Sequence, residues 1–99
     1  MRLSDKTRDI IKRETAQQLG VDAVVRLFGS RVDDTQRGGD IDLLIELSQP
    51  ISHPVQAECR LSASLYIQLG GRKVDVLITM PGKPIELVHE LALKNGIIL

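Results

Sequence analysis

The pattern that most constrains the fold is an alternation of apolar side chains between residues 40 and 47. Every second position is aliphatic over this stretch: Ile41, Leu43, Ile45 and Leu47. A period of two predicts a β-strand that buries one face. The opposite face carries Asp40 and Asp42, so the chain must build a sheet with one aliphatic face and one acidic face.

The segments around this strand predict a small α/β (α+β) domain. A cap at Ser4, a stop at Gly20 and the helical spacing of Leu61 and Leu65 are typical of helix boundaries and buried helix faces. We expect helices from 4 to about 18, from 52 or 53 to 69 and over 84–94, and further strands over 21–28 and 73–79. This order predicts a mixed β-sheet with helices packed on one face, in a single domain over residues 1–99.

Composition excludes several classes of protein. Lys plus Arg and Asp plus Glu are 13 each, and Phe28 and Tyr66 are the only aromatic residues. Direct nucleic-acid binding is therefore not expected. No uninterrupted apolar run exceeds three residues, which argues against a membrane span. The single cysteine, Cys59, cannot form an internal disulfide, and we expect a cytoplasmic protein in which Cys59 is a small buried side chain.

Three aspartates form the first candidate site. Asp40 and Asp42 are two positions apart in one strand, so their carboxylates share a face about 7 Å apart. Asp75 occupies the polar face of the strand over 73–79. If the two strands are neighbours, three carboxylates meet on one sheet face, a ligand set suited to Mg²⁺ or Mn²⁺. Glu46 lies farther along this face and is expected to be a rim residue or an ion-pair partner.

A phosphate-binding turn is predicted just upstream. Gly29 and Ser30 follow the strand over 21–28 and offer backbone N–H groups and a hydroxyl. Arg31 and Arg37 can add charge-assisted contacts to phosphate oxygens. Gly39 removes side-chain bulk just before the first aspartate.

These pieces together resemble the DNA-polymerase-β-like nucleotidyltransferase superfamily, and within it the minimal nucleotidyltransferases (MNT proteins). The resemblance is carried by three segments in order, Leu27–Arg31, Gly39–Leu43 and Val74–Val76. They form a Gly-Ser turn, an acid–apolar–acid strand and a later lone acid in a strand. The resemblance spans roughly residues 20 to 80 and implies the polymerase-β-like nucleotidyltransferase fold.

The resemblance also implies a reaction. Asp40 and Asp42 would hold two Mg²⁺ or Mn²⁺ ions, Asp75 would complete one of them, and Gly29 and Ser30 would bind the β- and γ-phosphates of a nucleoside triphosphate, with ATP favoured. A hydroxyl would attack the α-phosphorus and release pyrophosphate. MNT proteins commonly pair with HEPN-domain proteins as toxin–antitoxin systems. This chain would be the antitoxin, the acceptor a tyrosine of the toxin, and a homo-oligomer is possible.

A second function stays open from the sequence alone. The chain could neutralise a HEPN-type partner by forming a complex, with catalysis weak or absent. Asp33 and Asp34, which directly follow the Gly-Ser-Arg-Val segment, and a spacer of only nine residues between Ser30 and Asp40 favour this alternative. The intact aspartates oppose it. The tail over 97–99 either packs back on the domain or forms part of a partner surface.

Overall fold

The computed structural model describes residues 3–28, 41–83, 90 and 93–99 of the 99-residue chain. Its elements follow one another as α1 (Asp5–Leu19), β1 (Val24–Phe28), β2 (Ile41–Glu46), α2 (Pro54–Gln68), β3 (Val74–Thr79) and β4 (Ile97–Ile98). The predicted α/β (α+β) class is confirmed. Among the described residues, no helix has the length and apolar character needed to cross a membrane.

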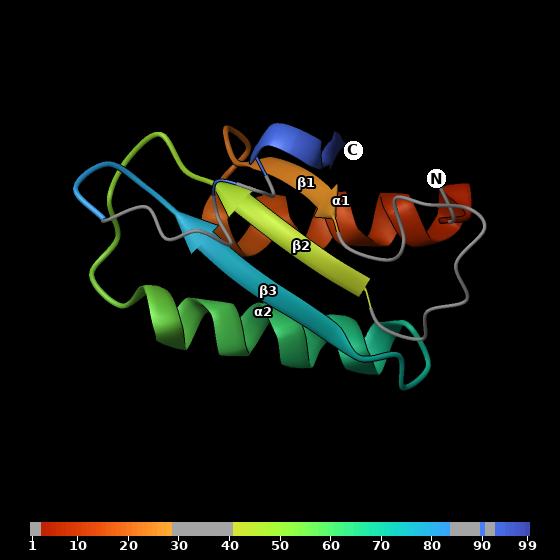
Figure 1. The fold of residues 1–99 in the computed structure, drawn as a ribbon. Coiled ribbons are helices and arrows are strands. Elements are labelled where there is room, and N and C mark those ends of the chain that lie inside the picture. Colours follow the sequence, from red (N-terminus) through yellow and green to blue (C-terminus); the bar gives the residue numbers. More distant parts are fainter. Residues whose placement is uncertain (1–2, 29–40, 84–89, 91–92) are drawn as a thin grey trace.

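The strands form one mixed sheet in the order β3-β2-β1-β4. β1 is antiparallel to both β2 and β4, whereas β2 and β3 are parallel. Parallel neighbours require a crossover connection, and α2 provides it. Helices α1 and α2 cover the same face of the sheet (Figure 1), as the sequence predicts.

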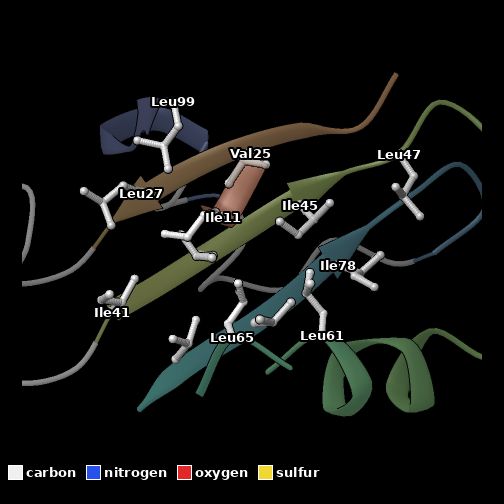
Figure 2. Close-up of a cluster of buried hydrophobic side chains, with 13 residues drawn as sticks. Ile11, Val25, Leu27, Ile41, Ile45, Leu47, Leu61, Leu65, Ile78 and Leu99 are labelled. Carbon is white, nitrogen blue, oxygen red and sulfur yellow. The ribbon is translucent and has the colours of Figure 1, made fainter. Parts of the chain in front are cut away.

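The core lies between this sheet face and the two helices. The alternating aliphatic residues of β2 point into it, where Ile41, Leu43 and Ile45 are fully buried. Leu61 and Leu65 of α2 and Ile11 of α1 belong to the same buried cluster (Figure 2). Burying a side chain of this size contributes about 1.5–3 kcal/mol, so these contacts hold both helices against the sheet.

The first helix begins and ends as its sequence predicts. The hydroxyl of Ser4 accepts a hydrogen bond of 3.1 Å from the backbone N–H of Thr7. Gly20 ends the helix with a φ of 104°, a conformation that favours glycine. The prediction that a strand starts at Val21 is wrong. Ala23 donates its backbone N–H to the carbonyl of Gly20, which closes a turn, and Val21 is 86% exposed.

The C-terminal tail packs back on the domain, the first of the two predicted alternatives. β4 pairs with β1, and the backbone N–H of Leu99 donates to the carbonyl of Val25 at 2.9 Å. The side chain of Leu99 is buried in the core. Of the predicted helix over 84–94, residues 90, 93 and 94 are helical, and the remaining positions lie outside the described residues.

Cys59 corrects one prediction, because its side chain is exposed. The reason is helical geometry. Each residue turns about 100° around the helix axis, so Cys59 lies about 200° from Leu61, which defines the buried face. A small apolar residue two positions from a buried one therefore faces solvent.

A polar network joins the two helices at their outer edge. The amide of Gln68 donates to one carboxylate oxygen of Glu14 at 2.8 Å, and the amide of Gln18 donates to the other at 2.9 Å. Gln18 also donates to the hydroxyl of Ser64. These hydrogen bonds, that from Gln68 first, favour the charged carboxylate and hold the pKa of Glu14 below its ordinary value of 4.5.

This network predicts a specific acid sensitivity. The pKa of Glu14 is lower in the folded than in the unfolded protein. The charged carboxylate therefore stabilises the fold fully above pH 4.5, and this contribution is lost as the pH falls through the pKa of the folded state. Glu14→Gln removes that pH-dependent contribution. In urea unfolding, we expect the stability advantage of the wild type over Glu14→Gln to shrink as the pH falls below 4.5. A constant difference across the acid range would contradict this assignment.

Candidate functional site

Asp42 and Asp75 are direct neighbours across the parallel pair of strands. The register of β2 and β3 makes the two residues Cα partners. Paired positions in adjacent strands lie about 5 Å apart, and their side chains leave the sheet on the same face. This face is opposite the core, because the residues on either side of each aspartate, such as Leu43 and Val76, point into the core. The structure thus joins two of the three predicted acids.

The face that carries the aspartates is organised in rows that cross three strands. The strand registers define these rows, in the order β1, β2, β3, as Phe28–Asp42–Asp75, Arg26–Leu44–Leu77 and Val24–Glu46–Thr79. The acidic row lies at one end of the sheet. The middle row separates it from Glu46, and Leu44 in that row is fully buried. Glu46 is therefore about 13 Å from Asp42 along the strand and belongs to a different part of the face.

Local strand geometry explains why the acids meet at this end. Each aspartate is the second residue of its strand, and both strands begin at the same level. The backbone N–H of Ile41 donates to the carbonyl of Lys73 at 3.0 Å, and this hydrogen bond fixes the register at the start of both strands. β1 runs in the opposite direction and ends at Phe28, the partner of Asp42. The chain therefore enters the predicted Gly29–Ser30 turn from a residue next to Asp42.

Both aspartates are accessible to solvent. The side chain of Asp75 is half exposed, and that of Asp42 is partly buried. Lys73 lies on the same face, with its Nζ 3.9 Å from Oδ1 of Asp75. Both members of this pair are solvated, so their attraction is weak and a ligand can displace the lysine.

Arg26 is a residue of this face that sequence reasoning missed. Its guanidinium lies 3.6 Å from the carboxylate of Glu46, which confirms Glu46 as an ion-pair partner. Within the described ranges, the Nε of Arg26 is buried and has no hydrogen-bond partner. The alternation of Val25 and Leu27 places Arg26 on the acidic face, and this signal was present in the sequence.

The other predicted site residues all lie outside the described residues. They are Gly29, Ser30, Arg31, Arg37, Gly39 and Asp40. Their roles stay predictions. Within the described ranges, no three His, Cys, Asp or Glu side chains gather as a metal-binding group, and Asp42 and Asp75 are a pair.

This pair suits a hard divalent cation. Two carboxylates on adjacent strands offer oxygen ligands from a common side, the chemistry that Mg²⁺ and Mn²⁺ prefer. Carboxylates on neighbouring strands also repel each other, and a bound cation removes that repulsion. The residues that are described therefore fit a divalent metal.

A groove borders the acidic row at the outer side of β3. It has a volume of about 590 Å³ and lies between β3 and α2. Asp75 contributes to its lining, together with Val74, Ala63, Tyr66 and Ile67. Tyr66 and Ile67 are exposed, at 51% and 76%. The acidic site thus opens onto a largely apolar surface.

Comparison with known protein families agrees with this geometry. The nucleotidyltransferase domain family matches residues 6–98, which include β1 to β4, α2 and all of α1 except its first residue. Among curated proteins, none matches the chain. The match covers nearly the whole chain, and it includes the strand pair that brings Asp42 and Asp75 together. The chain belongs to the nucleotidyltransferase domain family.

Proposed function

We propose that this nucleotidyltransferase domain transfers AMP from ATP, with Mg²⁺, to a hydroxyl of a protein partner. By resemblance to MNT proteins, the partner is a HEPN-domain toxin, the acceptor is one of its tyrosines, and the chain is the antitoxin. The observation that carries the proposal is the pairing of Asp42 with Asp75 on the sheet face opposite α1 and α2, with the side chain of Asp75 half exposed. Family membership supports nucleotidyl transfer in general.

The two aspartates have distinct places in this proposal. Asp42 lies between Phe28 and Asp75, so of these two carboxylates it is the nearer to the end of β1, where the predicted phosphate-binding turn begins. Asp75 lies on the outer strand, next to the groove along α2. We therefore assign the nucleotide side of the site to Asp42, together with Asp40, and the acceptor side to Asp75. Bound Mg²⁺ would supply the positive charge that phosphoryl transfer needs.

The groove supports a protein acceptor. Its described lining is largely apolar. The charged residues in it are Glu58, Lys73 and Asp75, and each carboxylate has a lysine within 4.0 Å. A polyanionic acceptor such as a nucleic acid needs a basic surface, which this groove lacks. An apolar protein segment that presents a hydroxyl fits this lining better.

A second function is kept because one feature favours it. Asp33 and Asp34 add negative charge close to the predicted triphosphate site, which opposes nucleotide binding. In this alternative the chain neutralises its partner by forming a complex, and catalysis is weak or absent. The two functions differ in whether a covalent product forms.

Transfer of label from α-labelled ATP separates the two functions. The chain is mixed with Mg²⁺, α-labelled ATP and the protein encoded by the adjacent reading frame. We expect label on that partner. Asp42→Asn and Asp75→Asn should each lower the rate by about 100-fold or more, as for the loss of one electrostatic contact in other enzymes. The measurement is the rate at which label enters the partner.

Glu46→Gln is the matched control for this experiment. It removes a carboxylate from the same strand face, but Glu46 lies two rows away from Asp75 and pairs with Arg26. We expect it to keep most of the activity. An inhibited partner that carries no label would favour the complex-forming alternative. Label transfer that survives Asp42→Asn would contradict the assigned site.

Metal binding also predicts a change in thermal stability. A ligand that binds the native state at a hundredfold excess over its Kd stabilises it by about 2.7 kcal/mol. For a domain of this size that amounts to a rise in Tm of about 10 °C or more. We expect Mg²⁺ plus ATP to raise the Tm of the wild type and of Glu46→Gln, and to leave that of Asp42→Asn/Asp75→Asn unchanged. Equal shifts in all three proteins would place the ligand elsewhere.

A further inference from the structure

The strand that carries Asp75 lies at the edge of the sheet. Among the described residues, β3 has a strand neighbour on one side, which is β2. The carbonyl of Lys73 accepts a hydrogen bond from Ile41 of β2, and that of Thr79 accepts one from Leu47, which directly follows β2. Backbone groups alternate in direction along a strand, so those of Val74, Val76 and Ile78 face outward. An edge of this kind usually lacks partners for its backbone groups.

Side chains take the place of a neighbouring strand along this edge. Ser62 of α2 donates its hydroxyl to the carbonyl of Val74. Glu58, one helical turn earlier, accepts the backbone N–H of Ile78 at 2.7 Å. Lys83 donates its ammonium to the carbonyl of Ile78 at 2.6 Å. We refer to these three hydrogen bonds as the edge contacts.

The contacts at Ile78 come from a coupled pair of charges. Nζ of Lys83 lies 3.7 Å from the carboxylate of Glu58, and their side chains are only 21% and 15% exposed. Glu58 therefore accepts from the N–H of Ile78, Lys83 donates to its carbonyl, and the two charged groups lie close to each other. Hydrogen bonds that involve a charged group are stronger than neutral ones, especially when they are shielded from water.

The edge contacts lie on both sides of Asp75 in the chain. Val74 precedes Asp75 directly, and Ile78 follows it by three positions. Apolar packing of Leu61 and Leu65 also holds α2 against the sheet, but packing alone is tolerant of small sliding movements. Directional hydrogen bonds to the backbone limit sliding and bending of β3, and so fix the position of Asp75 relative to Asp42.

We propose that Ser62 and Glu58 are positioning residues, which hold Asp75 beside Asp42 by bonding to the outer edge of β3. This inference rests on the proposed function, in which Asp75 is a metal ligand. Ser62 and Glu58 touch neither nucleotide nor metal in this account. They act through the backbone of the strand that carries Asp75.

The test combines variants of both residues with Mn²⁺ titration and amide hydrogen exchange. Ser62→Ala and Glu58→Ala remove the contacts, whereas Ser62→Thr keeps a hydroxyl and Glu58→Gln keeps an acceptor for Ile78. Thr15→Val is the matched control, because it removes a hydroxyl that donates to the carbonyl of Ile11 at 2.7 Å, a hydrogen bond within α1 that does not involve β3. Binding of Mn²⁺ alone is measured by calorimetry, and exchange is followed by NMR.

We expect Mn²⁺ affinity to fall several-fold in both alanine variants and to stay unchanged in Thr15→Val. The conservative variants should recover most of the affinity. Exchange of the Ile78 amide should accelerate by about tenfold in Glu58→Ala, as for the loss of one hydrogen bond to a charged group. Wild-type affinity in both alanine variants, or an equal loss in Thr15→Val, would overturn the proposal.

A wild-type protein that binds no Mn²⁺ would refute the metal site of the proposed function. Amide hydrogen exchange would then test, without the metal, whether Ser62 and Glu58 position Asp75. The readout is the amide of Asp75, which faces β2. Faster exchange at Asp75 in both alanine variants, but not in Thr15→Val, supports the positioning role. Unchanged exchange at Asp75 overturns it.

Discussion

The parallel pairing of β2 with β3 is the interaction on which the rest of this structure depends. Its register brings Asp42 and Asp75 together and aligns the aliphatic residues of both strands in the core. A slip of one residue would turn Asp75 toward the helices and move Val74 and Val76 out of the core. The packing of α2 against the sheet therefore stabilises the same register that the candidate site requires.

The two edges of the sheet are completed in different ways. Beside β1, the C-terminal tail adds β4 and a backbone hydrogen bond from Leu99 to Val25. Beside β3, side chains of Ser62, Glu58 and Lys83 bond to the backbone instead. Side-chain contacts leave space next to Asp75, where the groove along α2 lies. A further strand at this edge would occupy that space, so the groove stays available to the proposed acceptor.

The sequence predicted the elements well where periodicity is strong. Alternation along β2 and the spacing of Leu61 and Leu65 gave the correct faces, since burial follows directly from the repeat of each element. The pairing of β2 with β3 could not be predicted from the sequence, because it depends on contacts between residues that are distant along the chain. The short strand β4 was missed, because two residues are too few to show a period.

The site was predicted in part for the same reason. Asp42 and Asp75 belong to a motif with defined spacing and share a face as expected. The alternation along β1 could have placed Arg26 on the face of the aspartates, although a single arginine in an apolar strand is not part of a functional motif. Glu58 and Ser62 had no signal, because a polar residue on a helix is usually solvated. Their contacts with the backbone of β3 depend on the position of α2 beside this strand (Figure 1), which follows from the tertiary fold.

The central claim is that Asp42 and Asp75 together form a divalent metal site on the sheet face opposite α1 and α2. Paramagnetic broadening of backbone amide signals by Mn²⁺ tests it most directly, since the effect depends steeply on distance from the bound ion. The account predicts that the amides of Asp42 and Asp75 broaden first, at low Mn²⁺, and that Asp42→Asn/Asp75→Asn abolishes this selectivity. Broadening centred on Glu46 or on other carboxylates, or spread evenly over the acidic residues, would contradict it.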